Sequence, residues 1–468
     1  MRRVAILGGG ISGLAAAFSL HEARAAGVDV EFTVFEASER AGGCIETLQT
    51  QGFTMELGAD SLLADKPAAR ELLRRLQLES ELVGTPPQYR GARILHRGRL
   101  RPIPGDFQLF APTSLAALLT SGIFSARGIA RAALEPFIPP RSSDDDESLA
   151  SFVTRRFGRE VLDRLAQPLI GGIYSGDPQR LSMQATLPQF VEMEGRHGSV
   201  LRAMAADRSH AGRRNGSRAQ LMSLRGGLQT LVEALVQRLG SAVKTRAEVT
   251  GLQRDAQGWT LHFADGASAR ADAVVCALPA YTAAQLLPAI DSELAQMLEQ
   301  IRYNSITTVN LAYDAAELPS LPPATGFVVP AIEQRRITAA TIATQKYPQR
   351  APAERVLLRA FIGGALQPEL LAFSDEEPER IARAELRVLL HVSAQPQMAV
   401  VRRWDRLLPE YAVGHLRLVD TLERRAAALG GLALAGSAYR GVGIPDCIAG
   451  GQAAAGKLLS AWEPAKGG

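Results

Sequence analysis

A glycine-rich segment near the N-terminus has the residue types and spacing needed to hold the phosphates of a dinucleotide. Residues 8–13 read GGGISG and match the pattern G-x-G-x-x-G, and Glu36 ends the next apolar run. The first glycine permits a tight turn, the second lets the backbone approach a pyrophosphate, and the third lets a helix pack closely on a strand. The later acidic side chain accepts hydrogen bonds from ribose hydroxyls. The predicted contacts are Gly8, Gly9, Gly10, Ile11, Ser12, Gly13 and Glu36.

These contacts require a strand, a turn and a helix in a fixed order. The apolar pattern predicts a strand over residues 3–7, a helix over residues 11–26 and a second strand over residues 30–35. Two parallel strands joined by a helix form a right-handed unit, and the N-terminus of that helix offers positive potential to phosphates. A glycine-rich turn that binds no nucleotide is the alternative, but it does not account for the complete arrangement.

The residues after the second strand indicate which dinucleotide is bound. Residues 36–43 read EASERAGG, which resembles the motif at this place in the amine-oxidase-like flavoproteins. The glycines of that motif let the backbone pass close to an extended cofactor. Arg40 would offset phosphate charge, and its alternative role is that of a solvated loop cation. Cys44 stands where those proteins have a basic residue, which leaves a side-chain contact there open.

A second glycine-rich segment lies near the C-terminus. A predicted strand over residues 432–435 leads into the sequence GSAYRGVGIPD, and Pro445 suits the first position of a final helix. The start of such a helix would stabilise the negative charge of a reduced flavin. A plain strand–loop–helix connection is the alternative. Cys447 falls inside the predicted helix, so we interpret it as a packing residue and not as a site of covalent flavin attachment.

The sequence as a whole resembles the oxygen-dependent protoporphyrinogen oxidases and the closely similar coproporphyrinogen III oxidases. The resemblance covers essentially the whole chain, and its most specific segments are residues 147–158, 168–177, 181–183, 224–229 and 439–447. Amine oxidases and carotenoid desaturases share only the FAD motifs. The resemblance implies noncovalently bound FAD with further contacts from Ala37, Arg40, Gly43, Cys44, Gly58, Ala59, Asp60, Ser61, Val249, Gly436, Ser437, Val442, Gly443 and Ile444.

The same resemblance implies a substrate pocket. Arg93 corresponds to an arginine that the family places near a propionate, and a guanidinium can bind a carboxylate through two parallel hydrogen bonds. Gly172 corresponds to a position where the backbone lies close to the macrocycle. Phe327 and Val328 correspond to a wall of the same pocket. For Arg93, an ordinary surface arginine on a strand is the alternative.

The reaction that the resemblance implies is the oxidation of a porphyrinogen to a porphyrin in haem biosynthesis. The substrate loses six hydrogens, so one flavin would act three times, each time taking a hydride from a meso carbon while a pyrrole nitrogen loses a proton. Oxygen would reoxidise the flavin and yield hydrogen peroxide. The sequence contains no Ser/His/Asp set and no carboxylate pair with an evident role, so we name no catalytic residue.

Protoporphyrinogen IX is the expected substrate, and coproporphyrinogen III, with four propionates in place of two, is the alternative. Arg93, Arg97, Arg99 and Arg101 alternate with other residues and could line one face of a strand, which would suit the second substrate or simply face solvent. Oxidation of an amine is a more distant alternative, which would require an aromatic pair beside the flavin. A flavin-bearing tetrapyrrole carrier without oxidase activity is the alternative outside the enzymes.

The predicted fold is a mixed α/β structure with three parts. Residues 1–80, 221–295 and 430–468 would form a discontinuous Rossmann-like FAD-binding domain of the amine-oxidase-like type. Residues 81–105 and 296–429 would form a mixed-sheet substrate domain, and residues 106–220 a helical insertion. Alternation over residues 259–272 with a turn at Asp265 predicts a β-hairpin, and residues 205–219 are expected to form a mobile loop.

Composition and charge exclude several classes of protein. The net charge is only +4 and the basic residues are scattered, which argues against a nucleic-acid binder. The three cysteines are far apart and form no spaced set with the histidines, so we expect neither a disulfide framework nor a metal site. This pattern favours a reducing, cytoplasmic location. No apolar run reaches the length of a membrane span.

Partners other than porphyrinogen and oxygen stay open. Residues 107–138 are apolar and contain scattered arginines, so they could lie on the cytoplasmic face of a membrane as a peripheral contact. Packing inside the helical part or in a homodimer contact is the alternative. Hand-off of the product to the next enzyme of the haem pathway also stays open.

Overall fold

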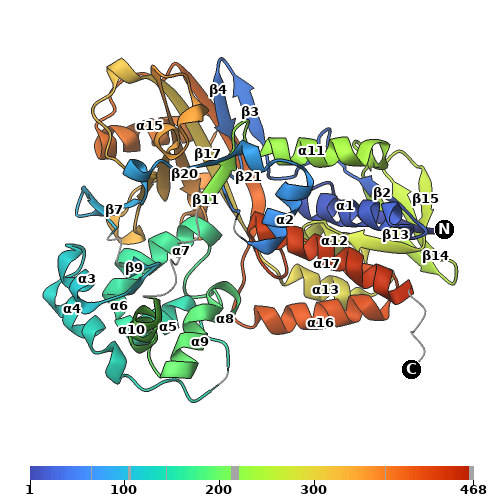
Figure 1. Ribbon diagram of the computed structural model, residues 1–468, viewed down its shortest axis with the longest axis horizontal. Helices are drawn as coiled ribbons and strands as arrows, with labels where there is room; N and C mark the ends of the chain where they lie inside the picture. Colours follow the sequence, from blue (N-terminus) through green and yellow to red (C-terminus); the bar gives the residue numbers. More distant parts are fainter. Residues whose placement is uncertain (65, 104–106, 144, 212–220, 375, 463–468) are drawn as a thin grey trace.

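The computed structural model describes residues 1–64, 66–103, 107–143, 145–211, 221–374 and 376–462 (Figure 1). Its first organising element is a five-stranded parallel sheet with the strand order β12-β2-β1-β16-β22. The strands come from both ends and the middle of the chain. They are β1 (Arg2–Leu7), β2 (Val30–Phe35), β12 (Val243–Lys244), β16 (Ala273–Cys276) and β22 (Leu432–Leu434).

The alternation of side chains along β1 explains why this sheet is covered on both faces. Val4 and Ile6 point into one apolar core and Ala5 and Leu7 into another, and all four side chains are at most 3% exposed. Helices cover each face (Figure 1). One core is shared by α1 (Ile11–Ala25), α2 (Pro67–Arg75), α11 (Gln229–Leu239) and α17 (Ile444–Trp462), and the other by α12 (Ala280–Leu286), α13 (Ser292–Glu299) and α16 (His415–Ala428).

The predicted strand–helix–strand unit and the predicted hairpin are confirmed. β1 and β2 pair in parallel on either side of α1 in the sequence, as the apolar pattern indicated. The hairpin belongs to a three-stranded antiparallel sheet of β13 (Val249–Asp255), β14 (Gly258–Phe263) and β15 (Ser268–Ala271).

A seven-stranded mixed sheet forms the second organising element, with the order β21-β17-β20-β19-β18-β7-β8. Helix α15 (Glu377–Leu390) covers one face, and the opposite face contacts the hairpin of β3 (Thr47–Thr50) and β4 (Phe53–Glu56). Only β18 and β7 pair in parallel. The strands are β7 (Arg93–His96), β8 (Arg99–Pro102), β17 (Tyr303–Asp314), β18 (Gly326–Val328), β19 (Ala339–Ile342), β20 (Arg355–Gly363) and β21 (Met398–Pro409).

A helical part built from residues 107–211 has its own apolar core. At its centre, the fully buried carboxylate of Glu135 accepts hydrogen bonds from Arg156 Nε at 2.7 Å and from the backbone N–H of Val200 at 2.9 Å. Its main helices are α3 (Leu115–Thr120), α4 (Ala126–Ala133), α5 (Leu149–Phe157), α7 (Gln167–Tyr174), α9 (Pro188–His197) and α10 (Val200–Ala211).

The expected mobile loop over residues 205–219 is wrong in its first half. Residues 205–211 continue α10, because Val200, Ala203 and Met204 on that helix are buried in the core of the helical part and anchor it. Residues 212–219 lie outside the described residues.

The apolar segment over residues 107–138 divides into two sets of side chains. Phe107, Phe110 and Ile123 pack inside the helical part, whereas Leu119 and Phe137 are 68% and 77% exposed. Among the described residues, no helix combines the length and the apolarity that crossing a bilayer requires.

Candidate functional site

The turn between β1 and α1 leaves open space at one glycine and is closely packed at the others. A Cβ added to Gly10 would meet no atom within 4 Å. One added to Gly8 would lie 2.8 Å from the carbonyl oxygen of Ala277, and one added to Gly13 would lie 1.9 Å from that of Gly8. The turn is therefore closed toward the sheet and open above Gly10, at the N-terminus of α1, as a bound pyrophosphate requires.

Glu36 lies beside this turn at the end of β2. Its Oε2 accepts a hydrogen bond from the backbone N–H of Gly9 at 2.7 Å, and its Oε1 accepts one from that of Ser38 at 2.9 Å. The carboxylate thus holds the glycine turn and keeps further lone pairs available for a ribose hydroxyl. Ala37 follows in the same loop. Val249, at the start of β13, lies next to this region because the N–H of Ala247 donates to the carbonyl of Glu36 at 2.8 Å.

The second glycine loop folds directly onto the first. The N–H of Gly42 donates to the carbonyl of Gly9 at 2.8 Å, and a Cβ on Gly43 would lie 3.4 Å from Cα of Gly10. Arg40 fixes the loop by donating to the carbonyls of Gly43 at 2.7 Å and Ile45 at 2.9 Å. Its guanidinium therefore organises the loop.

The segment after β4 is held in place by side chains from the seven-stranded sheet. The carbonyl oxygen of Leu57 accepts from Thr308 Oγ1 at 2.8 Å, Trp404 Nε1 at 2.8 Å and Arg359 Nη2 at 3.1 Å. A Cβ on Gly58 would lie 1.8 Å from the carbonyl oxygen of Cys44. The predicted contacts at positions 58–61 are thereby brought against the 40–44 loop, and Cys44 takes part through its backbone.

Asp60 and Ser61 are fixed by two further residues. Lys346 Nζ lies 2.8 Å from Asp60 Oδ2, and the hydroxyl of Ser61 lies 2.8 Å from that of Tyr347. Burial alone would raise the pKa of Asp60, but Lys346 and Arg359 together hold it well below its ordinary value. Asp60 is therefore a carboxylate at neutral pH. Ala59 follows Gly58 and donates its N–H to the carbonyl of Cys44 at 3.2 Å.

The C-terminal glycine loop joins β22 to α17 and is clamped by a tyrosine. The hydroxyl of Tyr411 donates to the carbonyl of Ser437 at 2.6 Å and accepts from the N–H of Gly441 at 2.7 Å. The ring of His415 stacks on Tyr411 with centroids 4.0 Å apart, and its Nε2 bonds to the carbonyl of Tyr439 at 2.9 Å. This clamp shapes the segment that contains Gly436, Ser437, Val442, Gly443 and Ile444.

Cys447 lies inside α17, as predicted, and is 6% exposed in an apolar core. Its sulfur lies 3.7 Å from the carbonyl oxygen of Gly441, and burial raises the pKa of the thiol to about 12. A thiol with this pKa is a poor nucleophile at neutral pH. The predicted position of Cys447 inside the final helix is confirmed.

The N-terminal and C-terminal glycine loops share one edge of the parallel sheet. β1 and β22 both pair with β16, so their carboxyl ends lie on the same side of the sheet, one strand apart. Ligands of open parallel sheets bind outside this edge. The sequence therefore assembles one site from residues near positions 10, 40, 60 and 440.

The four predicted substrate residues lie close together but face different ways. Phe327 pairs with Arg93 and Val328 with Ile94 in the parallel register of β18 and β7. Phe327 is 2% exposed in the core under α15, while Val328 faces α7, where a Cβ on Gly172 would lie 4.0 Å from its Cγ1. Arg93 is half-buried, and its Nε is buried without a hydrogen-bond partner among the described residues.

Sequence reasoning missed the residues that position the loops. Tyr411 and His415 follow a long strand, and Arg359 and Trp404 lie inside strands where they resemble ordinary sheet residues. Their partners are between 24 and 347 positions away in the chain. Local patterns carry no signal for such pairs.

The chain is similar to known flavin-containing oxidoreductases over nearly its whole length. Residues 11–459 match the family model described as flavin-containing amine oxidoreductase. The chain is 35% identical to coproporphyrinogen III oxidase of Bacillus subtilis over 98% of both chains. It is 30% identical to the chloroplastic protoporphyrinogen oxidase 1 of Arabidopsis thaliana over 95% of this chain and 86% of the other. A solved structure of a putative protoporphyrinogen oxidase from Exiguobacterium sp. 255-15 superposes with a TM-score of 0.87, at 32% identity and over 98% of this chain and 99% of the other.

We predict that Gly10→Val abolishes flavin binding while the protein stays folded. The new side chain would enter the open space above the turn and meets no protein atom at its Cβ. Flavin absorbance and thermal unfolding of the purified variant are the measurements. Gly195→Val is the matched control, because Gly195 also has open space around it and lies in the distant helix α9. A Gly10→Val variant that stays fully yellow would contradict the assignment.

Proposed function

This chain belongs to the flavin-containing amine oxidoreductase family, and from that premise we propose that it oxidises a porphyrinogen to the corresponding porphyrin, using FAD and oxygen. The observation that carries the proposal is the full-length match to a coproporphyrinogen III oxidase, 98% of both chains. Coproporphyrinogen III, the alternative in the sequence analysis, is now favoured over the expected protoporphyrinogen IX. The first three curated relatives have that name, and the β7–β8 hairpin has arginines that form no ion pair with any described residue. Protoporphyrinogen IX is the second candidate, supported by the Arabidopsis relative.

When bound, the flavin would supply the hydride acceptor that is reoxidised by oxygen. The protein's own residues would bind and orient. The backbone around Gly10 and Gly42 would hold the phosphates and adenosine end of the cofactor, and the clamp of Tyr411 would hold the loop at the opposite end. The unpartnered Nε of Arg93 would receive a substrate carboxylate, and the absence of a side chain at Gly172 would leave a slot for a flat macrocycle beside Val328. No side chain is proposed as a general base.

The direct test is to incubate the purified protein with each porphyrinogen in air and follow porphyrin fluorescence and hydrogen peroxide. We expect both products to form with coproporphyrinogen III, and faster than with protoporphyrinogen IX. Fluorescence that grows no faster than without protein would overturn the proposal. Bleaching of the flavin by substrate under anaerobic conditions separates an oxidase from a flavin-bearing carrier, which would bind the tetrapyrrole without bleaching.

We propose that the cofactor is noncovalent FAD. The candidate site extends from the turn after β1 to the loop before α17, which suits an extended dinucleotide. The high pKa of the Cys447 thiol disfavours a covalent thioether bond to the flavin. Acid precipitation is expected to release all of the flavin into the supernatant, where chromatography identifies it. Flavin that stays with the precipitate would show that a covalent bond exists.

For Arg93, we predict that replacement by alanine weakens binding of the porphyrinogen. Loss of a charge-assisted hydrogen bond costs about 1.5–3 kcal/mol, which corresponds to a rise in KM of roughly 10- to 150-fold. The flavin spectrum should change little. Arg93→Lys is the control, because it keeps the charge but loses the planar fork and should fall between wild type and Arg93→Ala. Unchanged KM values for both porphyrinogens would remove Arg93 from the pocket.

The proposed three-domain division follows the two sheets and the helical part. Within this arrangement we propose a peripheral contact of residues 107–138 with the cytoplasmic face of a membrane, supported by exposed Leu119, Leu134 and Phe137. Homodimer formation and hand-off of the product remain proposals of the same kind.

Flotation with anionic liposomes tests the membrane contact. At low salt the protein is expected to float, and replacing Leu119 and Phe137 by serine should reduce the floating fraction, because both side chains are largely exposed and would insert among the lipids. Ile332→Ser, at another exposed apolar position, is the control. Wild-type protein that stays at the bottom of the gradient would show that the segment serves only the helical part.

A further inference from the structure

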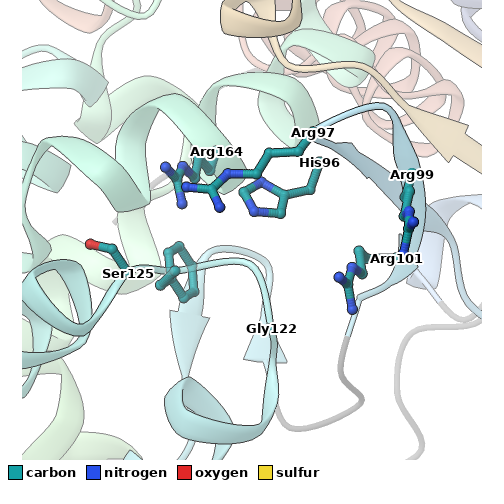
Figure 2. Close-up of a pocket in the computed structure, with 8 residues that line it drawn as sticks. His96, Arg97, Arg99, Arg101, Gly122, Ser125 and Arg164 are labelled. Carbon is teal, nitrogen blue, oxygen red and sulfur yellow. The ribbon is translucent and has the colours of Figure 1, made fainter.

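A strongly cationic cavity lies beside the β7–β8 hairpin, apart from the loops that form the flavin site. Its volume is about 330 Å³. Figure 2 shows Arg97 and Arg164 side by side next to the ring of His96, with Arg99 and Arg101 across the cavity. We call this set of five residues the arginine pocket. It joins the hairpin to the helical part, because Arg164 lies in the turn of helix that leads into α7.

The positive charge of the arginine pocket is poorly balanced. Arg164 forms an ion pair with Glu160. The side chains of Arg97, Arg99 and Arg101 form no ion pair or hydrogen bond with any residue that the structure describes. Glu333 is the other nearby acid, and its carboxylate accepts from the backbone N–H groups of Arg97 and Gly98 at 2.7 and 3.3 Å.

The pKa of His96 lies below its ordinary value. Burial lowers the pKa of His96, and the neighbouring charges of Arg164 and Arg97 lower it further. Three arginines of one hairpin and a fourth from a helix line one cavity. Arginines that merely faced solvent would not need to converge in this way. Guanidinium groups held close together repel one another, and a bound anion removes that repulsion.

The hairpin geometry also corrects the expectation that Arg93, Arg97, Arg99 and Arg101 line one face of a strand. The chain turns at Arg97, which has a φ of 51°, so the arginines occupy two strands and a turn. Arg93 pairs with Pro102 and Ile94 with Arg101, which places Arg93 on one face of the hairpin and Arg99 and Arg101 on the other. The arginine pocket is therefore a different place from the environment of Arg93.

The arginine pocket and the proposed substrate residues are nevertheless built on the same elements. β7 contains both Arg93 and His96, and one helical stretch contains both Arg164 and Gly172. Eight helical residues span about 12 Å. Ile94 and Leu165 are fully buried and belong to the apolar core beside the pocket. A ligand in the arginine pocket would thus lie within about one tetrapyrrole length of Gly172.

We propose that the arginine pocket is a capture site for the propionate groups of a tetracarboxylate tetrapyrrole, which it holds at the protein surface before the macrocycle enters the flavin site. The proposal rests on the proposed function. Arginine forks bind carboxylates through paired hydrogen bonds, and a cleft with one sign of charge raises the rate at which an oppositely charged ligand arrives. Coproporphyrinogen III has four carboxylates and protoporphyrinogen IX has two, so the pocket favours the former.

The decisive variant is Arg99→Gln combined with Arg101→Gln. Both side chains are exposed and lie outside the proposed flavin and Arg93 sites, so folding and kcat should not change. For coproporphyrinogen III we expect kcat/KM at low salt to fall about tenfold, and its decline with added salt to become shallower. For protoporphyrinogen IX we expect a smaller fall. Arg24→Gln combined with Arg238→Gln is the control, because it removes the same charge from exposed positions on α1 and α11.

The capture site would be overturned if the Arg99/Arg101 variant kept the wild-type kcat/KM and salt dependence. It would also be overturned if kcat/KM fell equally in the Arg24/Arg238 control, or if it fell equally for both porphyrinogens. Binding of coproporphyrin III, measured by fluorescence anisotropy, separates this outcome from failure of the proposed function. If the wild type oxidises neither porphyrinogen, the function is wrong. The capture site then stands only if the Arg99/Arg101 variant binds coproporphyrin III several-fold more weakly than the control does, and it falls if the two bind equally.

Discussion

The carbonyl oxygen of Leu57 joins the seven-stranded sheet to the loops at the edge of the five-stranded sheet. It accepts hydrogen bonds from Thr308, Trp404 and Arg359, which come from three different strands of the seven-stranded sheet. The residues that follow Leu57 pack against the glycine loop at Cys44, which in turn contacts Gly9 through Gly42. This short segment therefore joins the seven-stranded sheet to the glycine turn at Gly9, and a shift at Leu57 would be transmitted to both.

Buried charges surround the same segment. Arg350 lies 2.8 Å from Glu56, and both side chains are almost fully buried. Burial raises the pKa of Glu56, and the charge of Arg350 opposes that rise. Taking such groups out of water costs free energy that their attraction only partly offsets, so the network is a poor source of stability. Its effect is on geometry, because Glu56 also accepts from the backbone N–H of Leu228 at 2.9 Å and Arg350 also donates to the hydroxyl of Ser223 at 2.6 Å. That arrangement fixes the chain from Glu56 to Ser61 beneath the site.

The parts of the molecule that sequence could predict are those whose causes are local. The GGGISG turn, the helix that follows it and the strands before and after them follow from residue spacing over a short stretch of chain. The bend of the arginine segment at Arg97 could not be inferred from alternation, because a hairpin and a single strand show the same period until the turn is located. The hydrogen bonds of Tyr411 to the loop from Ser437 to Gly441 could not be predicted from the sequence either, because they join elements that meet only through tertiary packing.

One end of the candidate site consists mainly of backbone groups and the other mainly of side chains. This difference determines where substrate specificity can arise. The proposed cofactor end consists of glycine turns, whose close packing leaves room only for small residues at most positions. The proposed substrate end lies on β7, β8, β18 and α7, at the edge of the seven-stranded sheet beside the helical part. Substitutions on the β7–β8 hairpin can alter the charge presented to a tetrapyrrole without disturbing the turn at Gly10 or the bonds at Leu57. Under the proposed function, such substitutions would therefore change the preference among porphyrinogens with two or four carboxylates and leave the cofactor site unchanged.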